Sequence, residues 1–283
     1  MGFLNKLSFI NNKKVIFIFF LFFFSIFFNQ YYGHIGIFPV DSFTIFNSGY
    51  DVLNGRYPFK DYWTTTGFFL DIIQSFFFKI FGVSWSSYVL HASFFNAIIA
   101  ISTFYTLYKF KLEINYCFLY GMFVAILAYP SVGTPFVDHH STILSIVGLF
   151  AFILAIQTKL NFYWFILPII LGLAFLSKQV PAAYFSIIII FLSIIYFFFN
   201  FNINKIILLI LGTLTFLIFL FIFLLIFKIS PLSFIEQYIF HPMSLGKGRL
   251  EFIFPFEFKR VFLRFKLIHL SMIIIFFISL KKI

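Results

Sequence analysis

The chain has 283 residues, of which 62% are hydrophobic and only 10% are charged. A soluble domain carries about a quarter charged residues, so this composition excludes an ordinary soluble fold and makes lipid the solvent for much of the surface. The net charge of +11 is expected to set membrane topology and to meet anionic head groups, and nucleic acid is not an expected partner. The single cysteine, Cys117, excludes an intrachain disulfide and a cysteine-based metal cluster.

Long apolar runs predict an all-α fold, a polytopic transmembrane helix bundle of about eight spans. The first run follows Lys13 and Lys14 and has no small-residue cleavage site after it, which favours an uncleaved anchor over a signal peptide. The expected spans are residues 15–32, 85–108, 114–130, 141–157, 161–177, 181–199, 206–227 and 267–280.

The distribution of lysine predicts the orientation of these spans. With the N-terminus in the cytoplasm, the short cytoplasmic segments are rich in lysine and contain Glu113 as their only acid, as the positive-inside rule requires. The other acids then lie outside, in two long segments, 33–84 and 228–266, and in a short loop, 131–140. We therefore expect a multi-pass protein of the bacterial inner membrane whose active side is non-cytoplasmic.

Both long outer segments contain a pattern typical of interfacial helices. Residues 67–81 place Asp71, Ser75 and Lys79 on one face of an otherwise apolar helix, which would lie along the membrane. Residues 232–241 repeat the pattern, with Pro242 after them. Asp71, like Asp51, is interpreted as a solvated loop residue or a helix cap.

The first outer loop also contains candidate catalytic acids, Asp41 directly after the first span and Asp61 in an aromatic-rich turn. A carboxylate held close to a hydroxyl can take its proton, although both acids could instead be solvated loop residues. Aromatic and basic residues surround Asp61. Tyr57, Tyr62 and Trp63 are candidates for binding a sugar or acceptor, and Arg56 is a candidate for binding a phosphate.

This pattern resembles the C-type glycosyltransferase superfamily, integral-membrane enzymes that include protein O-mannosyltransferases and aminoarabinose transferases. In that family an acidic pair opens the first outer loop, and two helices lying along the membrane follow. Asp41 matches the first acid, whereas Ser42 stands at the second, and residues 63–67 replace a His-x-Pro-Pro-like stretch. The resemblance covers residues 15–230, the seven-span module. It implies one membrane domain over 1–283 that lacks the C-terminal region typical of the family.

The loop between the third and fourth spans contains Asp138, His139 and His140. By resemblance, Asp138 is the further acid that faces the first-loop aspartate, and the two histidines are candidates for binding the sugar or the acceptor. The three residues could instead bind a divalent cation together with Asp41 or Asp61, or Asp138 could cap the fourth span. No other cofactor is expected.

Two basic groups are candidates for binding the phosphate of a lipid-linked donor. Lys178 lies between the fifth and sixth spans, where a lysine can also simply snorkel to the head groups. The second group, Lys247 and Arg249, lies in a compact, glycine-containing loop after His241. Pro181 is expected to start the sixth span.

Together these features predict a membrane glycosyltransferase with polyprenyl-phosphate-sugar, a cell-envelope acceptor and membrane lipids as its partners. The sugar would pass to an acceptor hydroxyl outside the inner membrane, with inversion. A transporter or lipid flippase is the first alternative, and a non-catalytic, truncated relative is the second. A pocket at the outer interface that contains Asp41 and Asp138 would favour transfer, whereas a mid-membrane pocket open alternately to both sides would favour transport.

Overall fold

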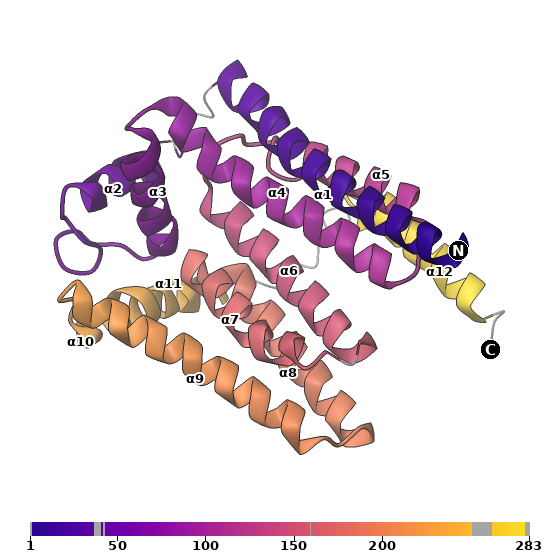
Figure 1. Ribbon diagram of the computed structural model, residues 1–283. Helices are drawn as coiled ribbons and strands as arrows, with labels where there is room; N and C mark the ends of the chain where they lie inside the picture. The colour runs from indigo at the N-terminus through magenta and orange to yellow at the C-terminus, as the bar shows by residue number, and fades with distance from the viewer. Residues whose placement is uncertain (1, 37–40, 42, 159, 251–261, 281–283) are drawn as a thin grey trace.

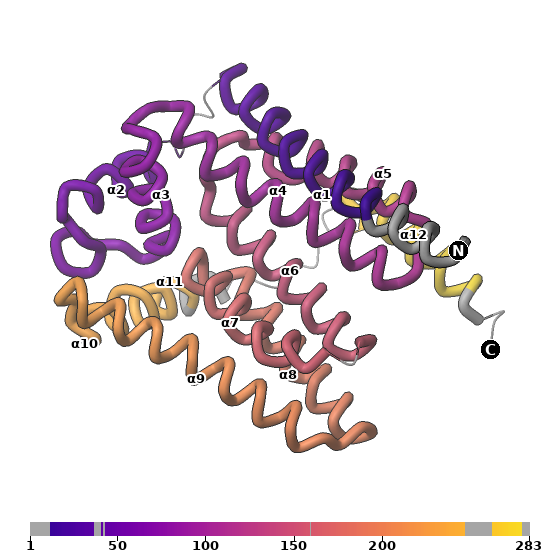
Figure 2. Tube along the Cα trace, viewed as in Figure 1, coloured from indigo at the N-terminus to yellow at the C-terminus, as the bar shows by residue number. Residues whose placement is uncertain are grey.

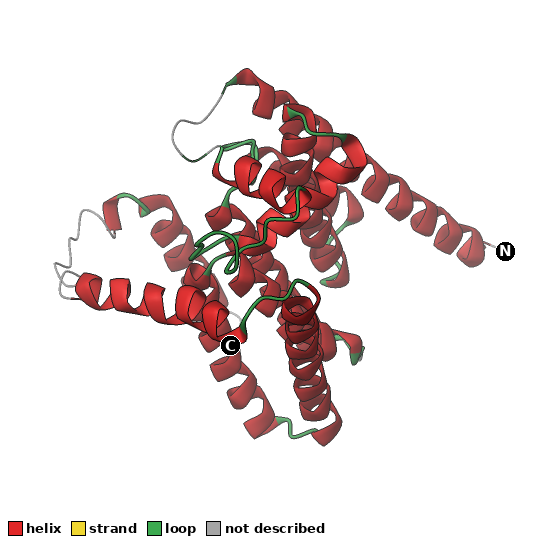
Figure 3. Ribbon diagram, turned by 90° about the vertical axis from the view of Figure 1, so that its left-hand side faces the viewer, coloured by secondary structure: helices red, strands yellow, loops and turns green. Residues whose placement is uncertain are grey.

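The computed structural model describes residues 2–36, 41, 43–158, 160–250 and 262–280, and it describes side chains over 12–246 and 262–278 with the same gaps. Figure 3 shows helices throughout this part of the chain, joined by loops and turns. Their bounds are α1 Gly2–Ile35, α2 Thr44–Leu53, α3 Phe68–Phe81, α4 Trp85–Lys109, α5 Ile114–Leu127, α6 Val137–Gln157, α7 Phe162–Ser177, α8 Gln179–Phe199, α9 Ile203–Ile226, α10 Pro231–Ile235, the π-helical turn η1 Glu236–Phe240, α11 His241–Leu250 and α12 Lys266–Leu280.

Each expected span coincides with a helix, which confirms a helical membrane bundle as the fold class. Five helices are long and apolar enough to cross a bilayer: α1 over Asn12–Ile35, α4, α6, α8 and α9. The apolar helices α5, α7 and α12 are shorter. The 14 residues of α5 give about 21 Å of helix, against about 30 Å of hydrocarbon in a bilayer. Among the described residues, length and composition therefore support five membrane-spanning helices, and the expected number of about eight is not confirmed.

The long helices pack side by side, and the shorter surface elements gather at one end of them. Helix α1 packs on α4 and α5, α6 contacts α4, α7 and α8, and α7 contacts α9. Figures 1 and 2 show α2 and α3 beside α10 and α11 at the end of the bundle away from the N-terminus. This end contains the loop between α5 and α6, the first turn of α6 and the junction of α7 with α8.

Buried amides connect the long helices where apolar packing alone would not fix their register. The Asn96 side chain in α4 donates to the carbonyl of Ala125 at 2.7 Å and accepts from the amide of Tyr129 at 3.2 Å, so it completes the end of α5. The Asn29 side chain in α1 donates to Ser93 and to the carbonyl of Gly133. Polar side chains that bond between helices hold membrane bundles together in this way.

Two expectations about local structure are wrong. Residues 137–140 are not part of a loop, because α6 begins at Val137 and carries Asp138, His139 and His140 on its first turns. Residues 241–250 form helix α11 instead of a compact loop. The π-helical turn η1 leads directly into α11, so the chain is helical from Pro231 to Leu250. Pro242 lies inside this stretch and has no N–H to donate to the carbonyl of Tyr238, which accepts from the side chain of Gln179 at 2.8 Å instead.

Candidate functional site

A cavity of about 330 Å³ lies where the surface helices meet the end of the bundle. Five residues that the sequence marked as candidates line it, from four different segments. The lining residues are Asp41, Thr44, Ile45, Ser48, Tyr62, Trp63, Thr64, Thr66, Asp71, Phe136, Val137, Asp138 and Lys178. The structure thus brings Asp41, Asp138, Lys178, Tyr62 and Trp63 together.

Lys178 and Asp138 form an ion pair on one wall of this cavity. The Lys178 Nζ lies 2.7 Å from Oδ1 and 2.8 Å from Oδ2 of Asp138, and the two side chains are 30% and 44% exposed. Lys178 is extended between α7 and α8, and its carbonyl accepts from Ser141 of α6 at 3.0 Å. Helix α6 has no side-chain cap bond, so the carboxylate of Asp138 binds this lysine instead of capping the helix.

Asp71 is the residue that sequence reasoning placed wrongly. Its side chain is 2% exposed, although we expected a solvated acid or a helix cap. Ser48 donates to Oδ1 at 2.5 Å and Tyr62 donates to Oδ2 at 2.9 Å. Burial raises the pKa of Asp71 to about 7, and the two hydroxyl donors oppose that rise.

Tyr62 presents its phenol to the same cavity. Burial raises the pKa of Tyr62 above its usual value, and the carboxylate of Asp71 raises it further. The hydroxyl therefore stays protonated and donates to Asp71, while its oxygen can still accept a hydrogen bond. Trp63 beside it is 58% exposed and meets His241 edge-on, with ring centroids 5.5 Å apart.

Three other candidates from the first loop make local contacts and do not line the cavity. Asp61 accepts from the amide of Tyr57 at 2.7 Å, which closes a turn. The exposed Arg56 pairs with the half-buried Asp51 at 3.0 Å. The ring of Tyr57 packs on Phe227, directly after α9, with centroids 4.5 Å apart. The contacts of these residues stabilise the loop.

The two adjacent histidines point in different directions because successive residues of a helix are rotated by about 100°. His139 lies 3.3 Å from the hydroxyl of Ser131 and faces an apolar groove. His140 is fully buried, and its Nε2 lies 3.0 Å from Nε2 of His91 in α4. Lys247 and Arg249 fall in α11, and their side chains lie outside the described residues.

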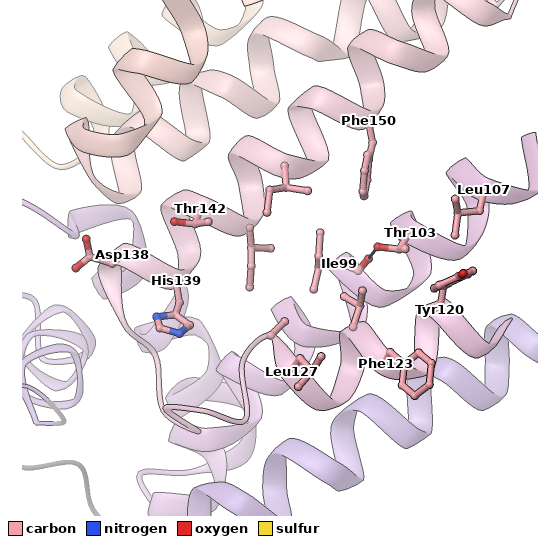
Figure 4. A pocket seen from close by; sticks show the side chains of 14 residues that line it. Ile99, Thr103, Leu107, Tyr120, Phe123, Leu127, Asp138, His139, Thr142 and Phe150 are labelled. Carbon is pink, nitrogen blue, oxygen red and sulfur yellow. Dashed lines mark hydrogen bonds between the residues drawn. The ribbon is translucent and has the colours of Figure 1, made fainter. Parts of the chain in front are cut away.

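The apolar groove runs along α4, α5 and α6 and has a volume of about 640 Å³. Figure 4 shows Leu107 and Tyr120 at one end of it and Asp138 and His139 at the other. Asp138 lines both the groove and the polar cavity, so the two spaces meet at this residue. The arrangement offers a hydrocarbon surface that leads to a charged compartment.

Two glutamines position the cavity wall made by residues 59–66. Gln179 at the start of α8 donates to the carbonyls of Thr65 at 2.6 Å and Tyr238 at 2.8 Å. Gln237 in η1 accepts from the amide of Thr64 and donates to the carbonyl of Phe59, both at 3.2 Å. Sequence analysis placed Gln237 on a polar helix face but could not tell that this face is covered.

Within the described part of the chain, no group of three or more His, Cys, Asp or Glu residues is placed to share a metal ion. Comparisons of the chain with protein-family models, with curated proteins and with solved structures found no match.

Proposed function

We propose that the protein transfers a sugar from a polyprenyl-phosphate donor to an acceptor hydroxyl at the non-cytoplasmic face of a bacterial inner membrane. The observation that supports this most strongly is the cavity that contains Asp41, Asp138 and Lys178 and shares Asp138 with an adjoining apolar groove. A lipid-linked sugar needs a polar compartment for its head and an apolar surface for its chain, side by side. The sequence resemblance to C-type glycosyltransferases points to the same chemistry.

In this proposal Asp41 is the general base. It takes the proton of the acceptor hydroxyl, whose oxygen attacks the anomeric carbon from the face opposite the phosphate. The bond from the anomeric carbon to the phosphate oxygen breaks, and the anomeric centre inverts. Lys178 stabilises the charge that develops on the leaving phosphate, which requires it to exchange part of its contact with Asp138 for the phosphate.

Transport is the alternative, and the arrangement of polar groups favours transfer over it. The buried histidines His91 and His140 are polar groups within long helices, as in many transporters. They bond to each other and to Gln74 and Tyr129, so they satisfy one another. The acids that line the polar cavity, Asp41, Asp71 and Asp138, lie at the end of the bundle where the surface helices gather.

The test compares wild-type protein with Asp41→Asn in membranes supplied with radiolabelled polyprenyl phosphate hexose or pentose. Loss of the base is expected to lower label transfer to envelope material by roughly 10²–10⁴-fold. Glu113→Gln is the control, because Glu113 begins α5 at the opposite end of the bundle and bonds only locally, to Asn115. Undiminished transfer by Asp41→Asn would remove Asp41 as the base. The absence of transfer by the wild-type protein with every donor would overturn the proposed function.

A further inference from the structure

Asp71 lines the cavity without a cationic partner. The ion pairs among the described residues are Arg56 with Asp51 and Lys178 with Asp138, and Asp71 belongs to neither. Its partners are the hydroxyls of Ser48 and Tyr62. A buried carboxylate held only by neutral donors bears most of the cost of its own desolvation.

The hydrogen bonds around Asp71 suit both of its charge states. Ser48 has one hydroxyl proton and two acceptors within reach, Oδ1 of Asp71 at 2.5 Å and the carbonyl of Thr44 at 2.9 Å. When Asp71 is ionised, Ser48 donates to Asp71. When Asp71 carries a proton on Oδ1, that proton is donated to Ser48, and Ser48 donates to Thr44 instead. Tyr62 donates to Oδ2 in both states, so protonation leaves no donor unpaired.

The charges that line the cavity favour binding of an anion when Asp71 is neutral. Three carboxylates, those of Asp41, Asp71 and Asp138, line it together with one lysine, Lys178. A phosphodiester would bring a further negative charge into this compartment, where charges are screened less than in water. Neutralising Asp71 removes one of the repelling charges without breaking a hydrogen bond.

We propose that Asp71 takes up a proton when a phosphodiester-bearing lipid enters the cavity, so that binding of the anion is coupled to protonation of this carboxyl. The inference rests on the proposed function in one respect, since it takes a lipid-linked phosphodiester as the ligand. Asp71 acts here as a specificity-determining residue, and the base assigned to the transfer step remains Asp41.

The direction of the pH dependence follows from the pKa of about 7 that burial gives Asp71. Below that pH the carboxyl is already neutral and the anion binds at full affinity. As the pH rises through 7, the fraction of protein with a protonated Asp71 falls. The apparent affinity for the anion falls with it, by up to about tenfold per pH unit. Other titratable or charged groups surround Asp71, and the test must separate them from it. The neighbours are Asp51 on α2 and Tyr62 in the loop before α3, Tyr88 and His91 on α4, and Tyr238 in η1. Asp41, Asp138 and Lys178 lie across the cavity.

The experiment measures binding of farnesyl methyl phosphate to the full chain in lipid nanodiscs by calorimetry, between pH 6 and pH 8. This diester keeps one negative charge over the range, so the ligand itself does not titrate. The wild-type protein is expected to bind about tenfold more weakly at pH 8 than at pH 6. Calorimetry in two buffers of different ionisation enthalpy is expected to show proton uptake on binding at pH 8. Farnesol, which has the chain but no charge, is expected to bind equally at both pH values, and dimethyl phosphate reports the head group alone.

Asp71→Asn is expected to bind the diester at pH 8 as tightly as the wild-type protein does at pH 6, without proton uptake. Damage to the fold would weaken binding, so this gain separates the proposal from a structural role. Asp51→Asn is the matched control, because Asp51 is a neighbouring acid on α2 that does not line the cavity. The pH dependence of diester binding should persist in this variant. Ser48→Ala should move the midpoint to higher pH, because it deletes a donor to the ionised carboxyl.

Wild-type binding that is equal at pH 6 and pH 8, or a pH dependence that persists in Asp71→Asn, would overturn the coupling and leave sugar transfer untouched. The absence of diester binding at every pH would overturn both the coupling and the lipid-linked donor. Binding of dimethyl phosphate with the affinity and pH dependence of the farnesyl diester would keep the coupling but assign it to phosphodiesters in general.

Discussion

His140 illustrates at the scale of single residues how the protein stabilises polar groups away from water. The amide oxygen of Gln74 can only accept, so His91 donates to it from Nδ1 at 2.9 Å. His91 Nε2 must then accept from Nε2 of His140, and His140 Nδ1 accepts from the hydroxyl of Tyr129. The amide of Phe136 completes the chain by donating to Tyr129 at 3.0 Å. The hydrogen bonds run in one direction from the α5–α6 loop to α3.

Replacing His140 with Ala is expected to break this chain in its middle. The change removes the donor to Nε2 of His91 and the acceptor of the Tyr129 hydroxyl proton, and it opens a void, so the free energy of unfolding should fall by about 2–4 kcal/mol. His139→Ala is the matched control, since His139 is the adjacent residue, is only partly buried and is expected to cost about 1 kcal/mol or less. Unfolding by SDS in mixed micelles measures both. Equal effects at the two positions would contradict the hydrogen-bond chain as a stabilising unit.

The sequence identified the cavity residues that carry charge near a span end, but not the one that is buried. Asp41, Asp138 and Lys178 stand out because each interrupts an apolar pattern at a helix end. Asp71 lies within a helix beside Ser75 and Lys79 at helical spacing, and that spacing indicates a polar face whether or not another element covers it. Only the packing of α2 and of residues 62–66 on α3 shows that this acid is covered.

At the scale of elements, helix boundaries were predictable where chain-breaking residues flank the apolar run. Helix α3 lies between Gly67 and Gly82, and Ser84 caps α4 with a reciprocal bond to Ser87. The start of α6 was missed because its first turn contains Asp138, His139 and His140, so it adds little to the apolar pattern. The start of α11 was missed because its glycines have low helix propensity, which favours a loop over a helix.

The end of α1 packs on the α5–α6 loop through two glycines. A side chain at Gly133 would place its Cβ 2.7 Å from Cα of Gly33, and Gly133 has a φ of +77°. The backbones of the two segments therefore touch, and the carbonyl of Gly133 accepts from Asn29. This contact determines how closely α1 approaches the loop that leads into the first turn of α6, where Asp138 lies.

Gly133→Ala is expected to cost about 2–4 kcal/mol of unfolding free energy, since it combines backbone strain with a main-chain clash. Gly82→Ala is the control for strain alone: Gly82 has a φ of +80° but no atom within 4 Å of the added Cβ, so only backbone strain of about 1–3 kcal/mol is expected. SDS titration of both variants gives the difference. A Gly133→Ala protein as stable as Gly82→Ala would show that α1 can move away from the loop at no cost.

At the scale of the whole molecule, the two ends of the bundle carry different charged groups. Lys14 and Lys109 both lie over the ring of Tyr105, at 5.2 Å and 5.3 Å from its centroid, so the start of α1 and the end of α4 share one end. The acids of the cavity lie at the other end. A membrane potential and anionic lipids would act on the two ends differently, which is the physical basis of the proposed orientation.

Labelling of single cysteines tests that orientation. Cys117 is fully buried and is expected not to react, so the natural chain serves as the background. Asn54→Cys, at the exposed end of α2, should react with a membrane-impermeant maleimide in intact spheroplasts. Asn200→Cys, in the exposed turn between α8 and α9, should react only after the membrane is opened. The opposite pattern would reverse the orientation and place the cavity in the cytoplasm.

The two glutamines that position the cavity wall have a consequence for how the protein can change. Gln179 and Gln237 bond to main-chain atoms of residues 59, 64 and 65 and to no side chain of that segment. Trp63, Thr64 and Thr66 can therefore be exchanged while the backbone that carries them stays in place. Related chains, or designed ones, can acquire a different ligand preference at these three positions without rebuilding the compartment around them.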